Sequence, residues 1–227
     1  MADALGARRV CSRLRLRRYD RMMMHRLALA LAVPACLIAA AGCGGDDDEV
    51  SSDEEARRAY LGLDNSVEKA LNLGMDGYSA ADNANIPDQS GVGEVAGTIV
   101  VSGQVDSGVS PNKEMRLYVA LVDYTDGPFA VDEDEEEEID IAYDTDEAAL
   151  PYLELSLRDI PNGTFTGTLT GDYLMDGDLE GEVTLELTMS GEIEGPDIDT
   201  ITRVEGTTHV TGTASAGDGT YEVDVTI

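Results

Sequence analysis

The sequence is short of the residues that build many functional sites. Its 227 residues include no tryptophan, two phenylalanines, two histidines and three cysteines. The cysteines are Cys11, Cys36 and Cys43, so no cysteine follows residue 43. The chain beyond that point therefore forms no internal disulfide and no thiolate metal site, and its fold must be held together by packing and strand pairing.

Basic residues are scarce after residue 42. The first 42 residues hold eight arginines against two acids, whereas the remainder holds 7 of the 15 basic and 44 of the 46 acidic residues, a net charge of −37. Nucleic-acid affinity rests on contacts between cations and phosphates, and a field of this sign repels phosphate backbones. We therefore expect no nucleic-acid partner. The length of this remainder is typical of one domain with a real core.

No apolar run is long enough for a relaxed membrane-spanning helix. The longest covers residues 27–39, follows His25 and Arg26, and has the length of a signal peptide. We interpret residues 1–42 as an export signal. Residues 1–21 are an overextended start, because methionines 22–24 offer a better-placed one. Small residues and a cysteine follow the apolar run, namely Ala40, Ala41, Gly42 and Cys43.

The segment Ala40-Ala41-Gly42-Cys43 resembles the lipobox of bacterial lipoproteins. The resemblance implies that a lipoprotein signal peptidase recognises Ala40, Ala41 and Gly42, and that Cys43 carries lipid as the first mature residue. The segment departs from the family at Ala40, where leucine is more common. Gly44, in place of an aspartate, favours the outer membrane of a double-membraned cell. An ordinary cleaved signal with a coincidental cysteine is the alternative.

A helix is predicted at residues 52–74, after a tether at 43–51. Ser52 and Glu55 have the spacing of a capping box, and Gly74 is a fitting end for the helix. Residues 75–94, rich in small polar residues without a period, predict a linker. Between the two helix ends, apolar residues recur at intervals of three and four and form one stripe: Ala56, Ala59, Tyr60, Leu63, Val67, Ala70 and Leu71.

From residue 95 the period of the apolar pattern changes to two. Residues 179–193 alternate apolar side chains with glutamates and threonines, which is typical of a strand with one wet face. Residues 115–124 are apolar on both faces. In the first strand, Val95, Ile99, Val101 and Val105 share one face. We predict seven antiparallel strands around an acidic loop at 125–150, with bounds 95–105, 115–124, 152–160, 164–174, 178–193, 200–214 and 219–227.

Three turns predict how the hairpins pair. Residues 161–163 and 175–177 each suit a three-residue loop, and residues 217–218 suit a two-residue turn. All three turns place apolar residues opposite apolar residues, as one buried face requires. The predicted pairs are Leu155 with Leu169, Leu169 with Val183, and Val210 with Val225.

The predicted fold class is mainly β (α+β). A curved antiparallel meander forms a half-barrel, a barrel or a sandwich, and one N-terminal amphipathic helix packs on it. Glycine inside a strand is tolerated where curvature or close approach needs the room. Glycines recur on the apolar face at Gly97, Gly103, Gly167, Gly171, Gly181 and Gly191.

Candidates for chemistry are few. Residues 132–138 are an unbroken acidic run, which could capture a divalent cation but lacks the alternating pattern of a calcium loop and is typical of a solvated segment. His209 falls on the wet face of its strand. Carboxylates are abundant enough to form pairs anywhere. The nine tyrosines are scattered, so no sugar-stacking platform is expected. We predict no catalytic residue, no metal site and no cofactor.

Two functions remain. The first is a lipid-anchored exported envelope protein of structural or interaction type, which is not catalytic and has an unidentified protein partner. The second is the binding of a lipid or small apolar ligand in a half-barrel cavity, by a fold-level resemblance to half-barrel lipoprotein carriers and lipocalin-like binders. A continuous cavity that opens to solvent favours the second function, and a solid core favours the first.

Overall fold

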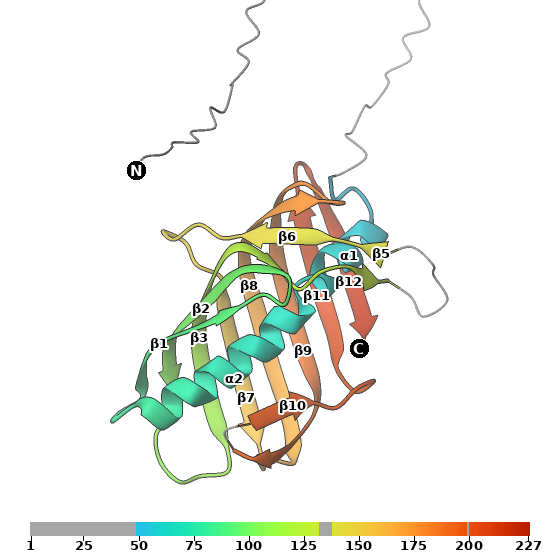
Figure 1. Cartoon of the computed structure of the whole chain (residues 1–227). Coiled ribbons are helices and arrows are strands. Elements are labelled where there is room, and N and C mark those ends of the chain that lie inside the picture. Colours follow the sequence, from blue (N-terminus) through green and yellow to red (C-terminus); the bar gives the residue numbers. More distant parts are fainter. Residues whose placement is uncertain (1–48, 132–137, 199) are drawn as a thin grey trace, which may run out of the picture. The chain divides into compact units, whose positions relative to one another are not determined.

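The computed structural model describes residues 49–131, 138–198 and 200–227. Two helices come first, α1 (Asp53–Leu61) and α2 (Asp64–Ala80). Strands follow to the end of the chain (Figure 1): β1 (Asn85–Val92), β2 (Ala96–Val105), β3 (Lys113–Thr125), β4 (Phe129–Ala130), β5 (Glu138–Ile139), β6 (Ile141–Asp144), β7 (Tyr152–Arg158), β8 (Gly163–Gly177), β9 (Gly181–Asp197), β10 (Thr200–Arg203), β11 (His209–Ala216) and β12 (Gly219–Thr226).

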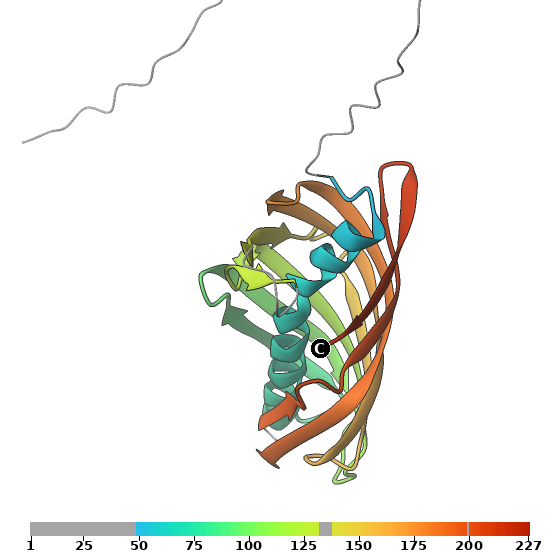
Figure 2. The same cartoon turned by 90° about the vertical axis from the view of Figure 1, so that its right-hand side faces the viewer.

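One antiparallel sheet dominates the described part of the chain. Its order is β1-β2-β3-β6-β8-β9-β11-β12, with β7 paired to both β3 and β8, and β10 paired to β9. Among the described residues the edge strands β1 and β12 do not pair with each other, so the sheet stays open as a half-barrel. Figure 2 shows α2 on the concave side of the curved sheet. The predicted fold class is confirmed.

The predicted helix at 52–74 begins where expected but is interrupted. Ser52 Oγ accepts from the backbone N–H of Glu55 at 3.2 Å and donates to the Glu55 carboxylate at 2.9 Å. These two bonds cap α1. The chain turns at Gly62, where a Cβ would overlap the hydroxyl of Tyr143. That hydroxyl donates to the carbonyl of Ala59 at 2.9 Å, so the sheet bonds a carbonyl that the end of α1 leaves free.

Gly74 does not end the helix, because α2 continues to Ala80. A Cβ at Gly74 would overlap the Cε atom of Met115 and lie 3.1 Å from Cδ1 of Leu117. The glycine lets α2 pack closely on β3. Glycine suits both a helix end and a close contact, and the sequence alone did not distinguish the two roles. The predicted apolar stripe is confirmed, because all seven of its residues are buried.

Residues 75–94 are not the predicted linker. They complete α2 and then form β1, which pairs with β2. The pairing is irregular between Ile86 and Gln89, where Pro87 cannot donate to the ladder and is tolerated because β1 is an edge strand. Ile86 is the one buried residue of β1, so the strand lacks the alternation by which strands are predicted.

Two other predicted segments are subdivided. Residues 200–214 form β10 and β11 rather than one strand, and both pair with β9. The chain turns between them at Gly206, whose φ of 76° lies in the left-handed region that glycine favours. The loop predicted at 125–150 contains β4, β5 and β6, and β6 pairs with β3 and β8.

The register predicted from the turn at 217–218 is confirmed, with Val210 opposite Val225. The registers predicted from the other two turns are wrong by two and by four residues. Both shifts are even, so each residue keeps its predicted face, because side chains alternate across a strand with a period of two. The observed pairs are Leu155 with Gly167 and Leu169 with Leu187.

Backbone bonds outside the two hairpins explain these shifts. The N–H of Ile160 donates to the carbonyl of Pro111 at 2.9 Å, so the end of β7 bonds to a segment outside the β7–β8 hairpin. The N–H of Asp178 donates to the carbonyl of Asp140 at 3.0 Å, and β8 continues to Gly177 along β6. Local turn chemistry contains no information about such distant partners.

The predicted alternation of buried residues is confirmed for 179–193 and fails at Val95. Leu179, Val183, Leu185, Leu187, Met189 and Ile193 are all buried. Val95 is 65% exposed, whereas Ile99 is fully buried. The register of β2 against β3 shifts between Ala96 and Thr98, which separates Val95 from the buried face.

We predict that Gly74→Val lowers the free energy of unfolding by about 1–3 kcal/mol, because the added side chain overpacks the contact with β3. Urea unfolding of the full chain measures the change. Asp76→Val is the matched control, since Asp76 is exposed on the same helix and the new residue is the same. It should change stability by about 0.5 kcal/mol or less. Equal midpoints for the two variants would contradict the close contact.

Candidate functional site

The residues of the lipobox-like segment lie outside the described residues. The roles of Ala40, Ala41, Gly42 and Cys43 therefore stay predictions. The acidic run lies outside them as well, except for Glu138, which is exposed in β5.

The concave side of the sheet is filled by the chain itself. Tyr60 from α1, Met75 from α2, and Leu117 and Leu185 from the sheet are all completely buried. These side chains belong to one continuous cluster of buried residues that joins the helices to the sheet. In the described part of the chain, this packing supports a solid core over a ligand cavity as the interpretation of the apolar face.

Two buried tyrosines line the contact between α1 and the sheet. The ring of Tyr143 meets the ring of Tyr173 edge-on, with 6.4 Å between the centroids and 88° between the planes. Burial raises the pKa of both tyrosines. Both phenols therefore stay neutral, and neither is a candidate for a reactive phenolate.

A buried ion pair joins α2 to β10. Arg203 donates from Nη1 to Oδ1 of Asp64 at 2.7 Å and from Nη2 to Oδ2 at 2.6 Å, and each side chain is 9% exposed. The hydroxyl of Tyr60 donates to the same Oδ1 at 2.7 Å. Burial lowers the pKa of Arg203, but the bonds to Asp64 raise it by more, so the guanidinium stays charged. The two-pronged geometry is specific to arginine and makes this contact a clamp.

The same face of α2 satisfies the backbone of β10. The N–H of Ile201 donates to Oδ1 of Asn72 at 3.2 Å, and the N–H of Arg203 donates to Oε2 of Glu68 at 3.2 Å. Glu68 and Asn72 are four residues apart, which places them side by side on a helix. Two helix side chains thus take the place of a neighbouring strand along β10.

An open groove of about 340 Å³ lies between the outer side of α2 and the β1–β2 hairpin. Lys69 in this groove is bonded to the carboxylate of Asp126. Asp126 also accepts from the hydroxyl of Tyr124 at 2.6 Å and from the N–H of Glu94 at 2.8 Å. The lysine is therefore already neutralised, and the groove gives an anionic ligand little attraction.

The convex side of the sheet carries a tyrosine pair. Tyr118 on β3 lies opposite Tyr152 on β7, with 5.2 Å between the ring centroids and 52° between the planes. Tyr118 is 48% exposed. Two of the nine tyrosines are thus brought together, and whether they form a sugar-stacking platform, which the sequence did not lead us to expect, stays a question of function. A hollow of about 290 Å³ lies in the neighbouring rows of the same face and is lined by Glu114, Glu154, Ser156, Thr166, Gly167 and Thr168.

Sequence reasoning missed this pair because the register of β3 against β7 brings it together. The long acidic loop between these strands contains no turn that predicts their register. The alternation of residues in the strand at 115–124 could have placed Tyr118 on the outer face, because Tyr118 is out of phase with Met115, Leu117 and Val119. Nothing local could have placed Tyr152 beside it.

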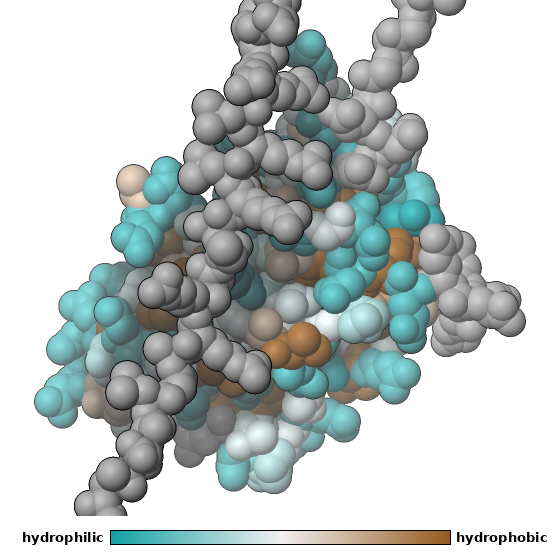
Figure 3. Space-filling model, turned by 45° about the horizontal axis from the view of Figure 1, so that its top comes forward, coloured by the Kyte–Doolittle hydropathy of each residue, from teal (hydrophilic) through white to brown (hydrophobic). Residues whose placement is uncertain are grey.

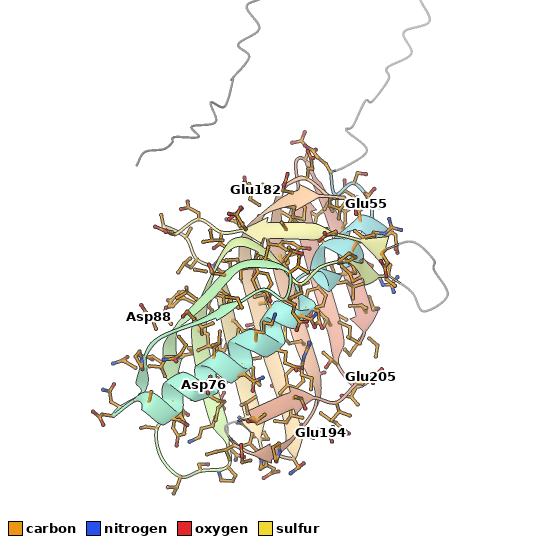
Figure 4. All side chains as sticks on the ribbon, viewed as in Figure 1. Glu55, Asp76, Asp88, Glu182, Glu194 and Glu205 are labelled. Carbon is orange, nitrogen blue, oxygen red and sulfur yellow. The ribbon has the colours of Figure 1, made fainter. Side chains whose placement is uncertain are left out.

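His209 lies on the exposed face of its strand, as predicted. Its Nε2 atom is 2.9 Å from Oδ1 of Asp224 on β12, and the side chain is half exposed. Among the described residues, no group of three or more histidines, cysteines and acids is placed to hold a metal ion. Figure 4 shows separate carboxylates around the outside of the molecule, at Glu55, Asp76, Asp88, Glu182, Glu194 and Glu205.

The visible surface is mostly hydrophilic. In Figure 3, hydrophilic side chains surround smaller hydrophobic areas wherever the grey atoms leave the surface in view. Within the described ranges, no helix combines the length and the apolar composition needed to cross a membrane.

Comparison with known proteins finds no match. No family model matches the chain, and no match is found among the curated proteins or among the solved structures.

We predict that Arg203→Ala destabilises the protein by about 3–5 kcal/mol, because it leaves the carboxylate of Asp64 buried without its charge partner. Arg116→Ala is the control, since it breaks an exposed pair with Asp106, and it should cost about 1 kcal/mol or less. Chemical denaturation of both variants measures the difference. Similar losses in the two variants would show that the buried pair does not clamp the helix.

Proposed function

We propose that this chain is an exported envelope protein that lipid on Cys43 holds at a membrane, and that it acts there through interaction or structure rather than catalysis. The segment Ala40-Ala41-Gly42-Cys43, directly after a short apolar run, carries this proposal. The glycine after the cysteine favours the outer membrane in a double-membraned cell. Two or three acyl chains anchor a protein almost permanently, whereas one chain is marginal.

The arrangement of the domain supports an interaction role over the binding of an apolar ligand. A carrier of lipid needs a cavity of several hundred Å³ with an apolar lining. Here the apolar face of the sheet is covered by α1 and α2, whose inward side chains are buried against it. The outer surfaces of the sheet and of α2 are thus the surfaces on which a partner can dock.

The charge of the domain narrows the choice of partner. A net charge of −37 after residue 42 repels nucleic acids and anionic surfaces. The domain is therefore held at the membrane by its lipid and not by attraction of its surface to phospholipid headgroups. A neutral or cationic partner is compatible with this field.

The intact mass of the chain purified from the membrane fraction tests the proposal. We expect a chain that begins at Cys43 and carries the mass of diacylglycerol, with a further acyl chain in many bacteria. Cys43→Ala should carry no acyl mass, because the sulfur that bonds the lipid is gone.

Gly45→Ala is the matched control, since it changes the tether by one methyl group and keeps the cysteine. It should be acylated like the natural chain. The proposed anchor would be contradicted by a natural chain without acyl mass, or by one that begins at another residue.

A further inference from the structure

On the convex face of the sheet, the pair of Tyr118 and Tyr152 lies next to a polar hollow. The register places Ser102, Tyr118, Tyr152 and Thr170 in one row across four strands, β2, β3, β7 and β8. The two tyrosine rings contact each other, and Tyr118 is 48% exposed. Solvent therefore reaches an aromatic surface in the middle of a row whose ends carry hydroxyl groups.

The next row on the same face carries an exposed carboxylate, that of Glu154. Glu154 lies opposite Arg116 on one side and Thr168 on the other. Glu154 is exposed, and within the described residues its carboxylate accepts no hydrogen bond. Its side chain lines the hollow of about 290 Å³ beside the tyrosine pair. A ligand that lies on the rings can thus donate hydrogen bonds to this carboxylate.

The other carboxylate of the hollow is already held in place. Glu114 accepts hydrogen bonds from Arg158 and, at 3.1 Å, from the hydroxyl of Ser156. The bond from Arg158 keeps the pKa of Glu114 below its ordinary value, so the group stays ionised. The ion pair with Arg158 therefore holds this side of the hollow in place and offsets the charge of Glu114, so the repulsion of a phosphate or carboxylate ligand comes from Glu154 and from the net charge of the domain.

Hydroxyl groups continue from the tyrosine pair along β8. Four successive outward residues of β8 are exposed threonines, namely Thr164, Thr166, Thr168 and Thr170, and the outward residues beyond them are Asp172, Leu174 and Asp176. The cores of protein interfaces are rich in aromatic side chains, methionine and arginine, and poor in acidic residues and serine. The two tyrosines fit that composition, but the carboxylates of Glu114 and Glu154 and the hydroxyls of Ser156 and of the four threonines do not. A polyhydroxylated ligand matches this face better than a protein surface does.

We propose that the face formed by Tyr118, Tyr152 and the adjoining hollow binds a neutral polysaccharide. A sugar ring presents polarised C–H groups to the electron-rich face of a tyrosine and hydroxyl donors to Glu154 and the threonines. An uncharged chain is not repelled by the acidic domain. The proposal deepens the interaction role proposed above, and rests on it, by naming the chemistry of the partner.

Native gel electrophoresis of the full chain in mild detergent tests the proposal. The gels contain hydroxyethylcellulose, glycol chitin, or polygalacturonate as the anionic control. We expect retarded migration in at least one neutral gel and none in polygalacturonate. Tyr118→Ala and Tyr152→Ala should each weaken binding about tenfold.

Two further variants separate stacking from folding. Tyr118→Phe keeps the ring and should retain binding. Leu174→Ala removes an exposed apolar side chain from β8 outside the tyrosine row, and should leave binding unchanged. Both alanine variants at the tyrosines should keep the natural melting temperature within a few degrees, because these rings lie on the outer face.

Free migration in both neutral gels, or retardation that survives the double alanine variant, would overturn the polysaccharide site. Sedimentation of the purified chain measures whether the tyrosine face instead binds a second copy of the chain. Self-association that depends on Tyr118 would assign the face to a second copy and would overturn the proposal as well. Neither result affects the anchor, which is decided separately by the acyl mass on Cys43.

Discussion

The ion pair between Arg203 and Asp64 determines where α2 lies on the sheet. Taking both charges out of water costs about as much as their attraction returns, so the pair adds little net stability. Its effect is selective, because a docking that keeps one of the two groups buried without the other leaves an uncompensated charge in the core. Glu68 and Asn72 strengthen the selection, since the same docking bonds the backbone of β10. The same face of α2 thus positions the helix and accepts the backbone hydrogen bonds at the edge of β10.

The close approach of α2 covers the apolar concave face of the sheet, which is then not open to a ligand. Gly74 removes a side chain at the contact with β3, and the inward residues of both layers meet without solvent. The chemistry that remains for a partner is on the outside, where acids and threonines prevail and one tyrosine pair is exposed. The charge of the domain, its filled core and the lipid that we propose on Cys43 therefore favour the same kind of role at an envelope surface.

The sequence predicted strands and their buried faces, which follow from the period of the apolar pattern. It did not predict the features that depend on contacts between distant segments, such as the register of two hairpins. The alternation at 179–193 located a strand and its buried face, and the turn at 217–218 predicted its hairpin to the residue. The hairpins after β7 and β8 kept their faces but not their partners, because Pro111 and Asp140 bond the chain near the turns. The edge strand β1 was missed because it buries one residue.

The candidate sites divide in the same way. Cys43 and the residues before it are a local motif that the sequence alone displays. His209 was placed correctly because alternation determines the face of a strand residue. The clamp at Arg203 and the pair of Tyr118 with Tyr152 join segments far apart in the chain. No local pattern relates such residues before the fold is known.

Helix α2 is part of the core and is not a lid over a cavity. Amide hydrogen exchange of the full chain tests this arrangement. We expect the amides of α2 to exchange as slowly as those at the centres of β8 and β9, through the same global opening. Rapid exchange in α2 while β8 and β9 stay protected would contradict it, because the helix would then open independently and expose the apolar face.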